Sequence, residues 1–283
     1  MRLEGMTNGS WILGDRKIDR LGFGAMRLPL AADFDAALGV LRRAVELGAD
    51  HVDTAAFYHQ QGIAANDLIR EAAFGPDVVV ATKVGPYRGP DDPFPTGQLP
   101  ADELRREVER NLRELGRDRL DLVYLRPGGL EPADDHSVAE RFEILAELRG
   151  EGVIRHLGLS HVTLAQVEEA RRIAPVVAIQ NRFDISQPAD TAMLAVCERD
   201  GIAYVPYFPL GGFGLPDDPR VAAVAARHGA SVPQVLLAGL LALSPVALAI
   251  PGTSSRAHLE ENMGAAALRL TEADVAELTG PAD

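Results

Sequence analysis

The feature that most constrains the fold of this chain is a regular alternation of short apolar runs, rich in β-branched residues, with longer amphipathic stretches. Counted from Leu21, eight short runs have the character of strands, and the stretches between them have the period of helices. Strands joined by helices must run parallel, so the pattern predicts a (β/α)8 barrel, a single domain over residues 1–283. The strands are expected at 20–24, in the run that ends at Asp53, and at 78–83, 120–125, 153–159, 176–181, 202–207 and 246–250. The helices are expected at 35–47, 65–73, 101–115, 138–149, 164–173, 189–199, 218–228, 231–242 and 256–265.

The main alternative is an open, doubly wound sheet. Such sheets that bind dinucleotides carry a Gly-x-Gly-x-x-Gly turn after a strand. Here Gly22-Phe-Gly24 continues into Ala-Met-Arg, and Gly211–Gly214 continues into Leu-Pro-Asp-Asp, so the barrel is favoured. Ahead of the barrel, 11–18 reads as two short strands around a Gly-Asp turn, which predicts an N-terminal β-hairpin that could plug one end.

Composition limits the partners of the chain. A net charge of −13 disfavours nucleic acid and anionic membranes as general partners. No apolar run is long enough to span a membrane, the start lacks a signal-peptide core, and Cys197 is the single cysteine. The histidines lack metal-binding spacings. We therefore expect a cytoplasmic protein without a metal, monomeric or weakly homo-oligomeric, that acts on small molecules.

Polar residues stand where the expected strands end. Active sites of barrels lie at the C-terminal ends of the strands, so these residues are candidates for one site. Any one of them could instead be a helix cap or a loop residue. Tyr58 follows Asp53 by five residues, and a lysine beside a phenol favours the phenolate, so Asp53, Tyr58 and Lys83 are expected to form a tuned proton donor. The strand-end residues are Asp53, Lys83, Arg126, Ser160, His161, Gln180, Asn181 and Tyr207.

Two further segments belong to the same expected face. The Gly- and Pro-rich connection 84–100 is predicted to be a lid or substrate loop. The turn Ile250–Ser255 leads into a helix, and its N–H groups and hydroxyls can hold a phosphate, with Arg256 and His258 adding charge. The simpler alternative is that Ser255 only caps the helix.

These residues together resemble the aldo-keto reductase superfamily over essentially the whole chain, from Leu21–Met26 to Ile250–Ser255 and Glu261-Asn262. The resemblance implies reduction of an aldehyde or ketone with NADPH. It places Asp53, Tyr58 and Lys83 in the catalytic tetrad of the family. The fourth member, a histidine in the family, falls on Arg126. The runs Tyr207–Phe213 and Ile250–Ser255, together with Arg126, look most like a bacterial branch that includes pyridoxal reductases.

The resemblance also implies a set of cofactor contacts. Tyr207 is expected to stack on the nicotinamide, and His161 stands where the family usually has an asparagine. Gly252 stands where a basic residue often grips the 2′-phosphate, so Arg256 or His258 is expected to replace it. The full expected set is Gly24, Ser160, His161, Gln180, Tyr207, Pro209, Leu210, Gly211, Gly252, Thr253, Ser254, Ser255, Arg256, His258, Glu261 and Asn262.

In the expected reaction a hydride passes from NADPH to the carbonyl carbon, Tyr58 protonates the oxygen, and Arg126 donates to that oxygen as charge develops. A fixed cation here is expected to lower the pKa of Tyr58 and to suit an anionic substrate such as pyridoxal. Alternatively, Arg126 is a surface residue paired with a loop carboxylate such as Asp134. Two other functions stay open, an NADPH-binding regulatory subunit or redox sensor with little turnover, and an isomerase or lyase that holds a substrate phosphate.

Overall fold

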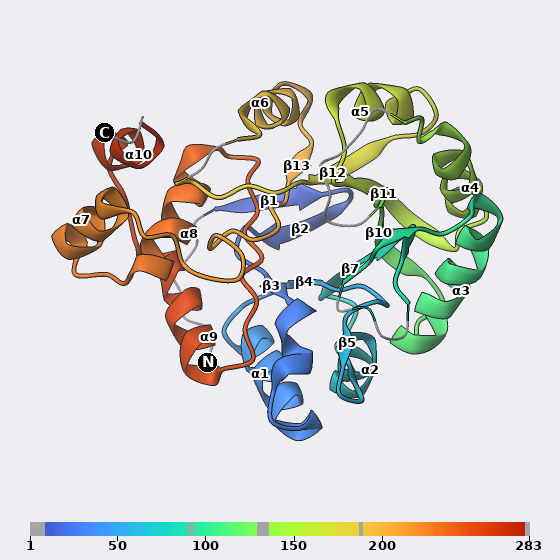
Figure 1. Cartoon of the computed structure of the whole chain (residues 1–283), viewed down its shortest axis with the longest axis horizontal. Coiled ribbons are helices and arrows are strands. Elements are labelled where there is room, and N and C mark those ends of the chain that lie inside the picture. Colours follow the sequence, from blue (N-terminus) through green and yellow to red (C-terminus); the bar gives the residue numbers. More distant parts are fainter. Residues whose placement is uncertain (1–8, 90–91, 93, 129–135, 187–188, 281–283) are drawn as a thin grey trace.

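The computed structural model describes residues 9–89, 92, 94–128, 136–186 and 189–280, which form a (β/α)8 barrel (Figure 1). Seven parallel strands pair in the order β13-β12-β11-β10-β7-β4-β3. The strands pair in the order in which they occur along the chain, and the gaps in their numbering are the short strands of separate hairpins. The strands are β3 (Phe23–Gly24), β4 (His51–Asp53), β7 (Val79–Val84), β10 (Leu120–Leu125), β11 (Ile154–Ser160), β12 (Val176–Gln180) and β13 (Ala203–Tyr204).

The segment 246–250, expected as the eighth strand, closes the barrel through single bridges and not through a continuous ladder. Ala247 bridges to Tyr204 on one side, and Ala249 bridges to Leu21 on the other. Prolines at 206 and 251 lack the N–H that a longer ladder needs, which also shortens the expected strand 202–207 to two residues.

Two glycines allow the backbones to meet closely at this closing seam. A Cβ atom on Gly24 would lie 2.6 Å from the carbonyl oxygen of Ile250, and one on Gly252 would lie 2.4 Å from the carbonyl oxygen of Gly24. Both distances are too short for a side chain, so the seam requires glycine at both positions.

Helices surround the barrel on its outer side (Figure 1). Their ends follow local signals, since Thr163, Ser231 and Thr271 form capping boxes, and Gly116 and Gly201 end helices in the left-handed conformation. The last helix, α10, lies beyond the helices predicted from the sequence. The helices are α1 (Phe34–Glu46), α2 (Ala65–Ala72), α3 (Leu104–Leu115), α4 (Ala139–Gly150), α5 (Leu164–Arg171), α6 (Thr191–Asp200), α7 (Pro219–His228), α8 (Val232–Leu243), α9 (Arg256–Met263) and α10 (Glu272–Thr279), with 3-10 turns η1 (Ala25–Leu30), η2 (Ala101–Glu103) and η3 (Gly264–Ala267).

Short hairpins add to the two ends of the barrel. The predicted N-terminal hairpin is confirmed as β1 (Ser10–Leu13) paired with β2 (Arg16–Asp19). Its residues Leu13 and Ile18 are buried against side chains that fill the barrel, such as Leu122, so the hairpin plugs one end. The hairpin turn is held by Asp15, which pairs with Arg155 and His156 of β11. The other hairpins are β5 (His59–Gln60) with β6 (Ile63–Ala64), and β8 (Pro86–Tyr87) with β9 (Gly97–Gln98).

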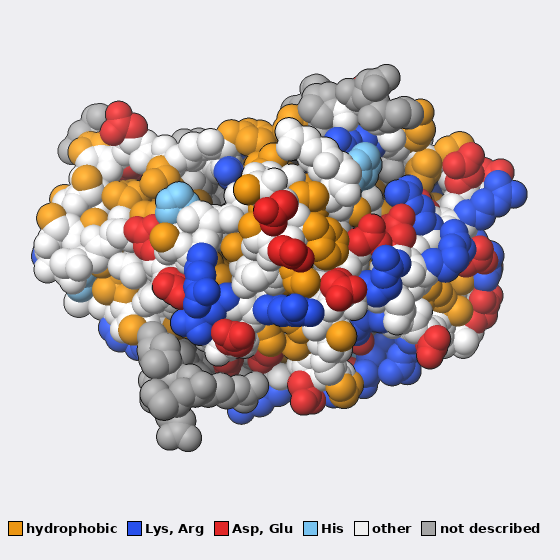
Figure 2. Space-filling model, turned by 90° about the horizontal axis from the view of Figure 1, so that it is seen from below, with side chains coloured by type: hydrophobic (Ala, Val, Ile, Leu, Met, Phe, Trp, Pro, Cys, Tyr) orange, Lys and Arg blue, Asp and Glu red, His pale blue; other side chains and the backbone are white. Residues whose placement is uncertain are grey.

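The visible surface carries charges of both signs, and apolar side chains fill the interior. On the face shown in Figure 2, basic side chains lie among acidic ones. The main core lies between the sheet and the helices, and a second cluster fills the barrel. Within the described ranges, no helix has both the length and the apolar character needed to cross a membrane.

Candidate active site

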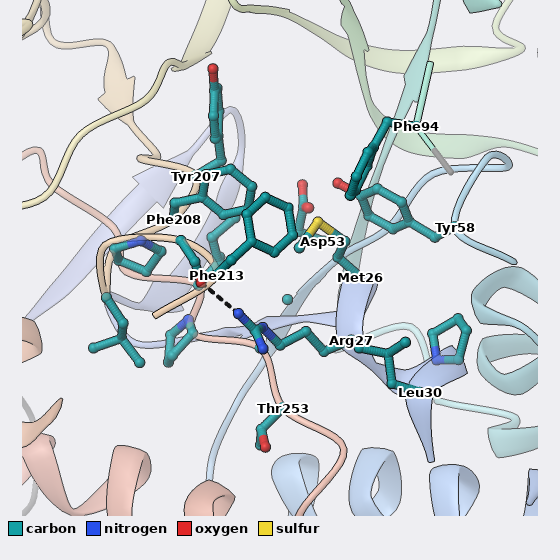
Figure 3. A pocket seen from close by; sticks show the side chains of 18 of the residues that line it. Met26, Arg27, Leu30, Asp53, Tyr58, Phe94, Tyr207, Phe208, Phe213 and Thr253 are labelled. Atoms are coloured by element: carbon teal, nitrogen blue, oxygen red, sulfur yellow. Dashed lines mark hydrogen bonds between the residues drawn. The ribbon is translucent and has the colours of Figure 1, made fainter. Parts of the chain in front are cut away.

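The C-terminal ends of the strands surround a cavity of about 630 Å³. All four residues predicted to act on the substrate, Asp53, Tyr58, Lys83 and Arg126, line it. Figure 3 shows how the labelled side chains lie: Tyr58 and Phe94 on one side of the cavity, and Tyr207, Phe208 and Phe213 on the other. The parallel sheet explains this convergence, because every strand presents its last residues to the same opening.

A buried ion pair lies at the base of the cavity. The Nζ atom of Lys83 is 2.6 Å from Oδ1 of Asp53 and also donates to the carbonyl oxygen of Thr54 at 2.9 Å. The second carboxylate oxygen of Asp53 accepts a hydrogen bond of 2.7 Å from Nε2 of Gln180. Lys83 is 2% exposed and Asp53 is 4% exposed. The two buried charges are therefore paired with each other and hydrogen-bonded to neighbouring groups, as burial requires.

Tyr58 lies next to this ion pair, with the Nζ atom of Lys83 4.8 Å from the centre of its ring. Burial raises the pKa of the Tyr58 phenol above its ordinary value, and the charges of Lys83 and Arg126 only partly oppose the increase. The expectation of a lowered pKa is therefore wrong, because the cost of removing a phenolate from water outweighs the nearby cations. Tyr58 is a protonated phenol at neutral pH.

Arg126 lies inside the site and not on the surface. Its side chain is 6% exposed, and its Nη1 atom donates to Oγ of Ser160 at 3.1 Å. Its Cζ atom is 5.0 Å from the centre of the Tyr207 ring. The surface alternative is thus wrong for this residue. Asp134, the partner considered for it, lies outside the described residues.

His161 and Tyr207 form a second pair of aromatic groups. The Nδ1 atom of His161 is 2.8 Å from the Tyr207 hydroxyl, and His161 has a left-handed backbone with φ of 59°. Tyr207 lines the cavity, whereas His161 and Ser160 lie behind the wall. The ring of Tyr207 is therefore held at its hydroxyl by His161, while the guanidinium of Arg126 lies over the ring.

At the other end of the cavity the structure divides the expected cofactor contacts into two groups. Ser255 caps α9, since its Oγ accepts a hydrogen bond of 3.4 Å from the N–H of His258. Arg256 points away, because its side chain is 67% exposed and pairs with Glu260. The expected contacts on the wall are Gly24, Gln180, Tyr207, Pro209, Leu210, Gly252, Thr253, His258, Glu261 and Asn262, and those off it are Ser160, His161, Gly211, Ser254, Ser255 and Arg256.

Several residues of the wall were not predicted. Arg27 of η1 reaches across to the carbonyl oxygen of Gly212, as the dashed line in Figure 3 shows. Phe94 and Phe213 meet at the mouth with ring centres 5.4 Å apart. Phe94 falls in the segment predicted as a substrate loop, so an aromatic side chain in that loop could have been predicted to line the cavity. Arg88, on the same segment, also lines the cavity.

Among the described residues no cluster of three or more His, Cys, Asp or Glu side chains could hold a metal ion. The groups that line the cavity include a phenol, a buried ion pair, a guanidinium and a flat aromatic ring. Such a set can transfer a proton and stabilise a developing oxyanion.

Known proteins resemble this chain in sequence and in fold. Residues 20–282 match the model of the Aldo/keto reductase family. Pyridoxine 4-dehydrogenase of Escherichia coli strain K12 is 44% identical over 286 residues, covering 97% of this chain and 99% of that protein. A thermostable aldo-keto reductase solved with the inhibitor epalrestat has a TM-score of 0.80 at 28% identity, with 96% and 98% of the two chains covered. An aldo/keto reductase from Klebsiella pneumoniae solved with NADP and acetate has a TM-score of 0.78 at 25% identity, with 95% and 93% covered.

Proposed function

This chain belongs to the aldo/keto reductase family, and from that premise we propose that it reduces an aldehyde or ketone with NADPH, with Tyr58 as the proton donor. One observation carries the proposal. Tyr58 stands in the cavity wall beside the buried pair of Lys83 and Asp53, where a carbonyl oxygen can approach it. The phenol is protonated at neutral pH, which is the form that an acid catalyst of reduction needs.

The two cations next to Tyr58 assist the proton transfer by acting on its product. As the proton leaves Tyr58, the forming phenolate attracts Lys83 and Arg126 more strongly than the neutral phenol does, so both cations stabilise the transition state selectively. Asp53 fixes the direction of the lysine ammonium group. Gln180 fixes Asp53 in turn.

Arg126 takes the place of the family histidine in this proposal. Its guanidinium carries several donors on a rigid plane, and it can donate to the carbonyl oxygen as negative charge develops there.

The wall fits a nicotinamide dinucleotide. Tyr207 offers a flat ring whose position is fixed by His161 and Arg126, and Gly24 and Gly252 line the cavity without side chains that would narrow it. When bound, NADPH supplies the hydride. In our proposal the residues that hold its adenosine end are Thr253, His258, Glu261 and Asn262, all on the same wall.

For the substrate we propose an aromatic aldehyde that carries a negative charge, such as pyridoxal. The support is the aromatic mouth formed by Phe94 and Phe213, the cation of Arg126 in the wall, and the identity of 44% to the E. coli pyridoxine 4-dehydrogenase. Stacking between the rings and pairing of the phenolate with the guanidinium would orient the aldehyde toward Tyr58.

Two measurements on the purified protein test the proposal. Titration with NADPH, followed by cofactor fluorescence, should saturate, and no saturation would favour an isomerase or lyase instead. Addition of pyridoxal to the saturated protein should then consume NADPH catalytically. Binding without turnover for pyridoxal and for a panel of aromatic and aliphatic aldehydes would indicate a cofactor-binding sensor.

A further inference from the structure

Arg88 forms a clamp around the segment that carries Tyr58. Its Nη1 atom donates to the carbonyl oxygen of Phe57 at 2.6 Å and to that of His59 at 2.9 Å, the residues on either side of Tyr58. Its Nε atom donates to the carbonyl oxygen of Asp92 at 2.7 Å. One guanidinium thus joins three backbone carbonyl groups, and two of them flank the phenol.

The backbone hydrogen bonds of Tyr58 itself are local in sequence. Its N–H donates to the carbonyl oxygen of Ala55 at 2.9 Å, and its carbonyl oxygen accepts from the N–H of Ala65 at 2.9 Å. Both partners belong to the same turn and to the start of α2. Arg88, in contrast, follows Lys83 by five residues and comes directly after β8. The clamp therefore links the segment of the phenol to the segment of the lysine.

We propose that Arg88 is a positioning residue that sets the distance between the Tyr58 phenol and the Lys83 ammonium group, an inference that rests on the proposed proton-donor role of Tyr58. The backbone around Tyr58 is irregular, and no ladder pairs residues 54–58 with a neighbouring strand. A guanidinium, with several N–H donors in one plane, can hold two carbonyl groups of such a segment that are not paired in a β-ladder.

The effect of Arg88 on the phenol is geometric. The cations whose charges act on Tyr58 are Lys83 and Arg126, whereas the charge of Arg88 falls on His59, whose pKa is lowered by burial and then by Arg88. Loss of Arg88 should leave both nearby cations in place and release the Tyr58 segment. A displacement of about 1 Å at a catalytic group can lower turnover by about 10²-fold.

The test is a double-mutant cycle between Arg88→Met and Tyr58→Phe, in the full-length protein with saturating NADPH and pyridoxal. Methionine keeps the apolar stem and removes the donors. In the wild-type background Arg88→Met should lower kcat by about 10- to 10²-fold, with the KM for pyridoxal and the Kd for NADPH changed by less than about threefold. In the Tyr58→Phe background the same change should lower kcat by less than about twofold, because no phenol is left for Arg88 to position.

Two further measurements separate positioning from general loss of structure. The alkaline limb of the kcat profile should move to lower pH in Arg88→Met, because water that enters around a loosened Tyr58 reduces the burial that raises its pKa. Arg42→Met is the matched control, since Arg42 also donates to a backbone carbonyl, that of Glu71 at 3.0 Å, but lies on the exposed side of α1. The control should keep wild-type kcat.

The outcomes distinguish this inference from the function on which it rests. Additive losses in the double mutant, or wild-type kcat in Arg88→Met, would overturn the positioning role alone. Wild-type kcat in Tyr58→Phe would overturn the proton donor and the positioning role with it. If Arg88→Met does not fold, Arg88→Lys carries the same cycle, because a single ammonium group cannot span the three carbonyl groups and should give an intermediate loss.

Discussion

Replacement of Arg126 by methionine should expose how much the guanidinium contributes to catalysis. The side chain is 6% exposed, and methionine can fill most of the same space, so the main losses are the charge and its hydrogen bonds. If Arg126 donates to the developing oxyanion, its loss should lower kcat by about 10² to 10³, or about 2.7–4 kcal/mol of transition-state stabilisation. The cation–π contact with the Tyr207 ring, whose centre is 5.0 Å from Cζ, is worth about 2 kcal/mol at a buried site, so the Kd for NADPH should rise by at most about thirtyfold.

The pH dependence separates a catalytic arginine from one that only packs. Wild-type kcat should stay level across neutral pH, because guanidinium does not titrate there. In Arg126→His the cation is present below the ordinary histidine pKa and is lost as pH rises through about 6.5, so kcat should be partly restored at low pH and decline toward the methionine value above it. The assay is kcat against pH for the three proteins with pyridoxal and saturating NADPH. Equal kcat in wild type and Arg126→Met across the range would refute the oxyanion role.

Three further predictions concern the cofactor and stability. NADPH should bind more tightly than NADH by a modest factor. His258→Ala should lower this factor and Arg256→Ala should leave it nearly unchanged, because His258 lines the cavity and Arg256 does not. Equal Kd values for the two cofactors in the wild type would contradict this prediction. Gly252→Lys should lower the free energy of urea unfolding by about 1–3 kcal/mol through overpacking at the barrel seam, whereas Gly39→Ala, with no atom near the added Cβ, should not destabilise α1. Asp15→Asn should lower the free energy of unfolding by at most about 1 kcal/mol, since the Asp15 side chain is 50% exposed. Hydrogen bonds from His156 and Arg155 lower the pKa of Asp15 from 3.8 to about 2, so the stability difference from wild type should be full above pH 3.8 and vanish as pH falls through 2. A stability difference that persists below pH 2 would contradict this prediction.

Most of the barrel and the centre of the site follow from local patterns in the sequence. The β-branched run that ends at Lys83 and the short run that ends at Asp53 become neighbouring strands, and the parallel fold brings their ends together. The family resemblance read from the motifs is confirmed by the match over residues 20–282. Helix α10 also had a usable signal, the capping box formed by Thr271 and Asp274.

The rest depends on contacts between distant segments. The pKa of Tyr58 depends on its burial, which no local pattern gives, so neighbouring charges alone predicted the wrong direction. The space at Gly252 is set by the backbone of Gly24, and the absence of a basic side chain there follows from that contact. Arg88 and Arg27 reach the cavity from irregular segments, where spacing does not determine where a side chain points.

The rate of a single turnover in Tyr58→Phe tests the proposed chemistry most directly. Wild type, Tyr58→Phe and the control Tyr87→Phe, in which an exposed phenol is removed, would be loaded with NADPH and mixed rapidly with excess pyridoxal, and the loss of cofactor fluorescence followed. We predict that the rate falls by about 10² to 10⁴ in Tyr58→Phe and is unchanged in Tyr87→Phe, with the Kd for NADPH alike in all three proteins. A wild-type rate in Tyr58→Phe would contradict the assignment of Tyr58 as the proton donor.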